Sequence, residues 1–298
     1  MIKDFFKKIH NDDFKWSDSV FILSIITYLL MEAGGILRAL VQLAVIKIFG
    51  RNDLTVMIAL YYGFIGYWII IILLCLVVKK YRYILHSLGK GLSGNTPKLF
   101  LIGLLAGFLL NLICALMAIL HGDIYLYFEP NNVFALLVIL VGVLIQSAAE
   151  EALYRGFLYQ GLRKGYRSPW VAIMVNPLFF AAMHLGNPGM TVLSFINIIM
   201  VGICFSLLVY YFDSIWLAMA AHGAWNYTQN VILGLPNSGI VFKYSFFKLD
   251  AAKATDSFFY NVDFGIEGTL MNLLALVLAS AAIVIIGRRK KLMEQKSV

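Results

Sequence analysis

Charged residues are scarce in this chain. Asp, Glu, Lys and Arg make up only 13% of the 298 residues, while hydrophobic residues make up 61%. The mean hydropathy is correspondingly high, at +0.83. Such a composition lies far outside the range of soluble globular domains and excludes a soluble protein. We therefore expect an integral membrane protein.

Cysteine is also scarce. Cys75, Cys114 and Cys204 all fall inside apolar runs and show no CxxC spacing, which indicates buried packing residues and no disulfide framework. The sequence also has no HExxH motif, and no Ser or Cys stands beside a His at a diagnostic spacing. A protease that uses a covalent nucleophile is therefore disfavoured.

Long apolar runs are what the chain has in abundance. A helix needs about 20 apolar residues to span a bilayer, whereas a β-barrel would show alternating segments of about 10 residues. The runs predict an all-α, polytopic bundle of about eight transmembrane helices, which forms a single membrane domain over residues 1–298. The expected helices cover residues 18–48, 54–78, 99–120, 133–163, 170–185, 191–212, 214–233 and 267–287.

The basic residues predict the orientation of the chain. The loops after the second and fourth expected helices are rich in Lys and Arg, whereas the expected outer loops 121–132 and 186–190 have none. By the positive-inside rule both termini are cytoplasmic, and the net charge of +8 is a topology signal rather than a nucleic-acid-binding surface. The structure of residues 234–266 is not predicted. The basic residues at the two ends are Lys3, Lys7, Lys8, Lys15, Arg288, Arg289, Lys290 and Lys291.

The fourth expected helix contains a dense set of charges, in the stretch SAAEEALYRGFLYQGL. Glu151 and Arg155 are i, i+4 neighbours and can pair, while Glu150 points about 100° away and needs another partner. Ionisable groups in hydrocarbon are costly and by default functional. A solvated helix end at the cytoplasmic surface is the simpler alternative for these charges.

Two further expected helices carry histidines. Phe180 and His184 share a face in FFAAMH, and His222 and Asn226 share a face in AAHGAWNY. Taken separately, His184 is interpreted as a packing residue, and His222 with Asn226 is interpreted as a polar contact between helices. Counting 1.5 Å per residue from the presumed cytoplasmic helix ends changes that interpretation, because all three helices then carry polar groups about 12 to 22 Å deep. We therefore expect one interior cavity within the membrane.

The chemistry of such a cavity is limited by its members. A carboxylate and an imidazole can hold and deprotonate a water, and a second histidine with an amide can stabilise the oxyanion formed at a carbonyl. That arrangement would hydrolyse a peptide bond directly. One Glu and two His would equally form a zinc site with an open water position, so the residues alone leave a metal possible.

Three segments resemble a known family. EEALYR, FAAMH and HGAWN are similar to the EExxxR, FxxxH and HxxxN motifs of the CPBP family, which includes CAAX proteases, bacteriocin-processing enzymes and Rce1-type prenyl-protein endopeptidases. The resemblance covers about residues 133–231 and implies an intramembrane glutamate protease without a cofactor. Glu150 and His184 would then activate the water. His222 and Asn226 would form the oxyanion hole. The supporting motif residues would be Glu151, Arg155 and Phe180.

The expected partners are a peptide or protein substrate at the membrane, such as a prenylated precursor, and the lipid bilayer. Nucleic acid is not expected. The sequence carries no address for a eukaryotic organelle, so we expect a bacterial plasma membrane. A non-catalytic scaffold or bacteriocin self-immunity protein of the same family is the alternative, and a proton-coupled transporter is disfavoured because no inverted repeats are evident.

Overall fold

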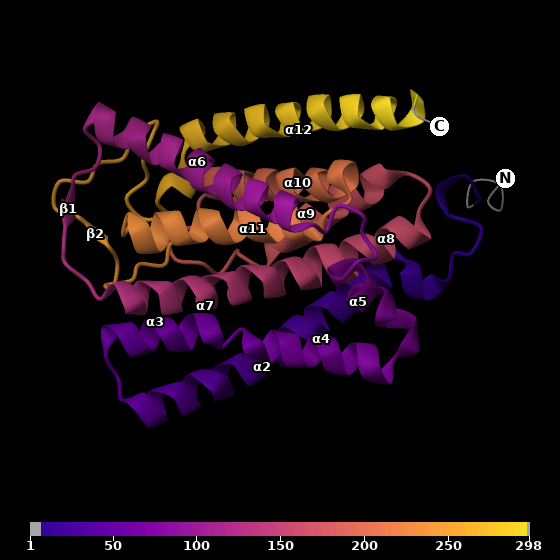
Figure 1. Ribbon diagram of the computed structural model, residues 1–298, viewed down its shortest axis with the longest axis horizontal. Helices are drawn as coiled ribbons and strands as arrows, with labels where there is room; N and C mark the ends of the chain where they lie inside the picture. Colours follow the sequence, from indigo (N-terminus) through magenta and orange to yellow (C-terminus); the bar gives the residue numbers. More distant parts are fainter. Residues whose placement is uncertain (1–6, 297–298) are drawn as a thin grey trace.

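The computed structural model describes residues 7–296, which form a bundle of long helices (Figure 1). Lys3, one of the predicted N-terminal charges, lies outside the described residues. Six helical segments of the described chain are long and apolar enough to cross a membrane, which confirms an all-α polytopic bundle. They are α2 (Val20–Phe49), α3 (Asp53–Tyr62) with α4 (Ile65–Val77), α6 (Pro97–His121), α7 (Val133–Glu151) with η3 (Ala152–Tyr159) and α8 (Gln160–Gly165), α10 (Val192–Phe212), and α12 (Leu270–Lys296).

Two of the expected spans are shorter. Helix α9 (Pro169–Ala182) has 14 residues, and α11 (Ile215–Asn226) has 12 residues before it continues as the π-helical turn η4 (Tyr227–Ile232). The expected total of eight crossings therefore stays a prediction. The shorter elements are η1 (Trp16–Asp18), η2 (Lys79–Arg82), α5 (Tyr83–Leu88), β1 (Leu126–Phe128), β2 (Phe247–Leu249) and η5 (Ile266–Gly268).

One predicted helix boundary is wrong at the site. The helix expected over residues 170–185 ends at Ala182, so His184 lies in the turn that follows it. The physical reason is the run Gly186 to Gly189, which contains Asn and Pro and favours turns over helix. His184 therefore lies just beyond the C-terminal end of α9 and not on one of its faces.

Polar caps decide where the long helices begin. The first N–H groups of a helix have no partner inside it, and in a membrane they need one from a side chain. In six helices a Ser, Thr or Asn immediately before the first helical residue accepts such an N–H. These capping residues are Ser19, Asn52, Thr96, Asn132, Thr191 and Ser214.

Helix α7 runs through the middle of the bundle (Figure 1). It packs against α3 and α4 on one side and against α11 on the other, while α10 packs against α9 and α12. The described chain begins and ends at the same end of the bundle, and the small β1–β2 sheet lies at the opposite end (Figure 1). This agrees with two termini on one side of the membrane; which side that is stays a prediction.

Helices α6 and α11 approach each other very closely. A Cβ at Gly103 would lie 2.5 Å from the Leu217 carbonyl oxygen, and a Cβ at Gly107 would lie 2.1 Å from that of Ala221. Two glycines four residues apart are the small-residue pattern that lets membrane helices touch along their backbones. The result is that α11, which carries His222, is seated firmly against α6.

The stretch after η4, whose structure the sequence did not predict, is ordered. Strand β2 pairs antiparallel with β1, so this stretch is tied to the loop before α7. Gly239 and Gly265 adopt φ values of 81° and 80°, and a Cβ at either would lie about 2 Å from a proline carbonyl oxygen. These two tight turns bring Asn237 and Glu267 back toward α11.

Candidate active site

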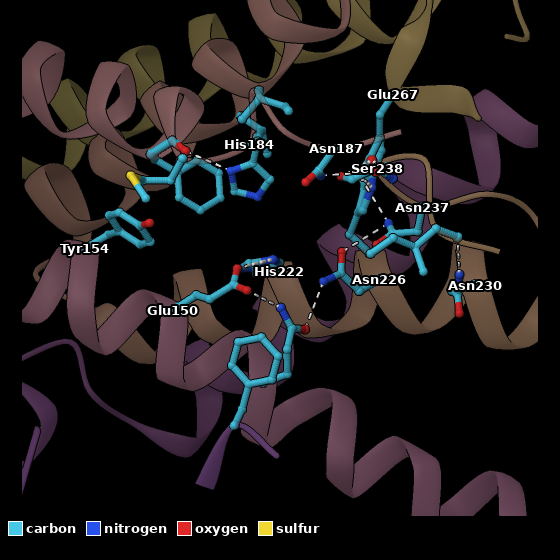
Figure 2. Close-up of a pocket in the computed structure, with 18 of the residues that line it drawn as sticks. Glu150, Tyr154, His184, Asn187, His222, Asn226, Asn230, Asn237, Ser238 and Glu267 are labelled. Carbon is cyan, nitrogen blue, oxygen red and sulfur yellow. Dashed lines mark hydrogen bonds and ion pairs between the residues drawn. The ribbon is translucent and has the colours of Figure 1, made fainter. Parts of the chain in front are cut away.

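A cavity of about 310 Å³ lies within the bundle. Glu150, His184, His222 and Asn226 all line it, as the depth argument predicts, and Figure 2 shows them facing it from three sides. They come from α7, the turn after α9, and α11. All four residues thus line one cavity, and the catalytic roles that the family resemblance implies for them stay predictions.

Glu150 is the penultimate residue of α7, and its two carboxylate oxygens have different surroundings. Gln146 Nε2 donates a hydrogen bond of 2.7 Å to Oε1. Oε2 lies 3.7 Å from His222 Nε2, which is too long for a hydrogen bond. One oxygen is therefore held by the protein, and the other is free to hold a water. Gln146 was not singled out from the sequence, although it is the polar residue one turn before Glu150 in an apolar run.

His222 is oriented by the carboxylate beside Glu150. Its Nδ1 lies 3.1 Å from Glu151 Oε1, and since a carboxylate only accepts, Nδ1–H donates. The imidazole also stacks on Phe205, with ring centroids 5.4 Å apart. These contacts direct Nε2 toward Glu150 and the cavity.

Glu151 and Arg155 form the predicted ion pair, with Nη1 donating to Oε1 at 2.9 Å. Both side chains are 0% exposed, so the solvated helix end considered from the sequence is wrong for this pair. Arg155 lies within η3, where its second amino group donates to the Gly202 carbonyl at 3.1 Å. Its guanidinium also lies over the Phe180 ring, 5.0 Å from the centroid. Phe180 therefore contacts the charges behind the site.

His184 is fixed by its own turn. Nδ1 lies 2.8 Å from the Phe180 carbonyl oxygen, which can only accept, so Nδ1 carries the proton. In the neutral imidazole Nε2 then has a free lone pair, and the ring faces the cavity opposite Glu150 (Figure 2). No hydrogen bond or ion pair within residues 7–296 joins His184 to Glu150 directly.

Asn226 has both ends of its amide engaged. Nδ2 donates to Gln146 Oε1 at 3.2 Å, and Oδ1 accepts from Asn237 Nδ2 at 3.3 Å. Asn237 also donates to Glu267 Oε1 at 3.2 Å. Asn237 and Glu267 line the cavity but were missed. Asn237 lies in the stretch 234–266, for which the sequence offered no periodicity. Glu267, in η5, stands at the first residue of the last expected helix, where an acidic residue is ordinary.

The zinc alternative can be tested on the placement of its ligands. Across the part of the chain that the structure describes, no group of three His, Cys, Asp or Glu side chains is placed to hold a metal ion together. Glu150, His184 and His222 share the cavity without converging as a ligand set.

Residues 132–228 match the family model of the type II CAAX prenyl endopeptidase Rce1-like proteins. This match supports the CPBP/CAAX protease family for that segment. The Rce1-like match confirms the resemblance predicted over residues 133–231 and contains all three motifs. The Rce1-like proteins are proteases, which supports a peptide hydrolase for this multi-pass membrane protein. No curated protein matches the chain.

Proposed function

We propose that the protein is an intramembrane endopeptidase that hydrolyses a peptide bond with water activated by Glu150 and His184. The observation that carries this proposal is that two bases and two donors, all from the Rce1-like segment, converge on one cavity. The substrate is a membrane-associated peptide, such as a prenylated precursor. The proposed location is a bacterial plasma membrane with both termini in the cytoplasm.

The water is held between Glu150 Oε2 and His184 Nε2, two acceptors that line the cavity and accept no hydrogen bond from the described residues. As the water attacks the carbonyl carbon of the scissile bond, Glu150 takes its proton. The same proton then passes to the leaving amine, which leaves Glu150 ionised for the next cycle. His184 keeps its acceptor toward the water because its other nitrogen is bound to the Phe180 carbonyl.

The oxyanion formed in this attack is stabilised by His222 and Asn226. Asn226 Nδ2 already points as a donor toward α7. In the imidazolium form, His222 Nε2–H is a second donor, because Nδ1–H is committed to Glu151. The 3.7 Å between His222 and Glu150 means that a carbonyl oxygen can accept from Nε2–H without breaking a hydrogen bond. A preorganised donor of this kind is worth about 10² to 10³ in rate.

Replacing Glu150 with glutamine tests the proposal, because glutamine keeps the shape but is not a base. Membranes that contain wild type or Glu150→Gln are compared for the small peptides and membrane-protein fragments that accumulate. Glu129→Gln is the matched control, because Glu129 is 51% exposed in the loop before α7. We expect fragments with wild type and the control and almost none with Glu150→Gln. Equal cleavage by Glu150→Gln would overturn the assignment, and a cellular function retained without any cleavage would indicate a scaffold.

A further inference from the structure

The two acids at opposite ends of the cavity are joined by a continuous row of side-chain amides. Glu267 Oε1 accepts from Asn237 Nδ2 at 3.2 Å, and the same amino group donates to Asn226 Oδ1 at 3.3 Å. Asn226 Nδ2 donates to Gln146 Oε1 at 3.2 Å. Gln146 Nε2 donates to Glu150 Oε1 at 2.7 Å. Figure 2 shows the part of this row that runs from Glu267 through Asn237 to Asn226.

Every hydrogen bond in this row has a fixed direction. An ionised carboxylate only accepts, so Glu267 requires the amino group of Asn237 to face it. The second hydrogen of that amino group then meets Asn226 Oδ1, which turns Asn226 Nδ2 away toward Gln146. The carboxylate of Glu150 imposes the same direction on Gln146 from the other end. Glu150 and Glu267 therefore impose the same orientation on the side-chain amides of Gln146, Asn226 and Asn237.

We propose that Gln146, Asn237 and Glu267 are positioning residues for peptide hydrolysis, and that they set which end of the Asn226 amide faces the substrate. This inference rests on the proposed function above, in which Asn226 is an oxyanion donor. A reversed amide would present an oxygen to the oxyanion and repel it. The row therefore maintains an electrostatic arrangement that packing alone does not specify, since the two ends of an amide have nearly the same shape.

Glu267 is anchored well enough to act as the fixed end. Its Oε2 accepts from Ser238 N at 2.6 Å and from Ser238 Oγ at 2.7 Å, and its Oε1 also accepts from Trp225 Nε1 at 2.9 Å. Trp225 precedes Asn226 on α11, so the same carboxylate ties the helix to the loop. No Lys or Arg of residues 7–296 pairs with Glu267, and its charge is met by these donors.

Asn237→Asp separates orientation from shape, because the two side chains are nearly isosteric. Aspartate only accepts, so it faces Glu267 with like charge and offers Asn226 Oδ1 no hydrogen. Asn226 can then form a hydrogen bond with residue 237 only if its side-chain amide reverses and Nδ2 donates to the aspartate. Glu267→Gln is a second variant with a smaller perturbation, because its amide places a donor among the four donors that the carboxylate receives.

The experiment measures kcat and KM for hydrolysis of a prenylated precursor peptide by full-length reconstituted protein. The variants are Asn237→Asp and Glu267→Gln, each with and without Asn226→Ala. We expect Asn237→Asp to lower kcat by about 10-fold to 10²-fold with KM changed less than about 3-fold, and Glu267→Gln to lower kcat by about 3-fold to 10-fold. In the Asn226→Ala background both effects should shrink to less than about 2-fold, because coupled residues are not additive. Asn131→Asp, in the loop before α7, is the matched control and should leave kcat unchanged.

Equal fold-losses with and without Asn226→Ala would overturn the inference, because they would show that the row acts only through general stability. Wild-type kcat in Asn237→Asp would overturn it as well. If Asn237→Asp does not fold, as judged by thermal unfolding in detergent, Glu267→Gln decides by the same comparison. Activity retained by Glu150→Gln would instead refute the proposed function, whereas a dead Glu150→Gln with unaffected Asn237→Asp and Glu267→Gln refutes only the row.

Discussion

Replacing Arg155 with methionine should destabilise the folded protein by about 3 to 5 kcal/mol, because it leaves the carboxylate of Glu151 buried without its cation. Both side chains are 0% exposed, with Nη1 and Oε1 2.9 Å apart. The methionine also removes the 3.1 Å hydrogen bond to the Gly202 carbonyl. A loss of this size lowers the ratio of folded to unfolded protein about 150-fold to 5,000-fold.

The double variant Glu151→Gln with Arg155→Met separates charge burial from catalysis. It removes both charges and should recover most of the lost stability, since a buried ion pair replaced by uncharged groups is often neutral. Activity should stay low, because His222 Nδ1 loses the carboxylate that orients it. The assay is unfolding in mixed micelles with increasing SDS, alongside peptide hydrolysis. A cost below about 1 kcal/mol for Arg155→Met, or no recovery in the double variant, would refute the reasoning.

Other predictions follow from single contacts. Gly107→Ala places a Cβ 2.1 Å from the Ala221 carbonyl oxygen and should cost about 1 to 3 kcal/mol in the same unfolding assay; an unchanged stability would contradict the close helix contact. Asn226→Ala should lower kcat by about 10² to 10³ with KM little changed, and a loss below about 3-fold would exclude an oxyanion donor. Activity should survive a strong chelator, whereas one stoichiometric zinc that tracks activity through removal and reconstitution would establish a zinc enzyme. Reporter fusions at the two ends should both report the cytoplasm, and opposite sides would refute the predicted topology.

The long helices could be predicted because a bilayer leaves few alternatives. A chain in hydrocarbon must satisfy its backbone hydrogen bonds within one segment, so an apolar run of sufficient length becomes a helix. The boundaries depend on turn chemistry instead. The second expected helix is one run in the sequence but breaks at Gly63 and Phe64, and the fifth ends at Ala182. The length of an apolar run in the sequence predicts neither of these helix breaks.

The four cavity residues could be found because hydrocarbon makes isolated polar groups conspicuous. Glu150 and His222 stand out from apolar neighbours, and counting along each helix gives their depth. Asn237 and Glu267 could not be found in that way. Asn237 lies in a loop, where polar residues are ordinary and no periodicity relates them to a helix face. Glu267 lies at the start of the last expected helix, where an acidic residue is equally ordinary. Only the folded structure shows that Asn237 contacts Asn226 and that Glu267 contacts Asn237.

The cavity is formed jointly by residues 132–228 and by helices that lie outside this segment. Met31 and Tyr67 contribute to its wall from helices that precede the matched segment, and Glu267 contributes from beyond it. A recombinant exchange that moved residues 132–228 alone into another helical framework would carry the motifs but leave behind the walls and the anchor of the amide row. In this protein the three motifs alone therefore do not make a complete site. The flanking helices must evolve together with residues 132–228 for the cavity to keep its walls.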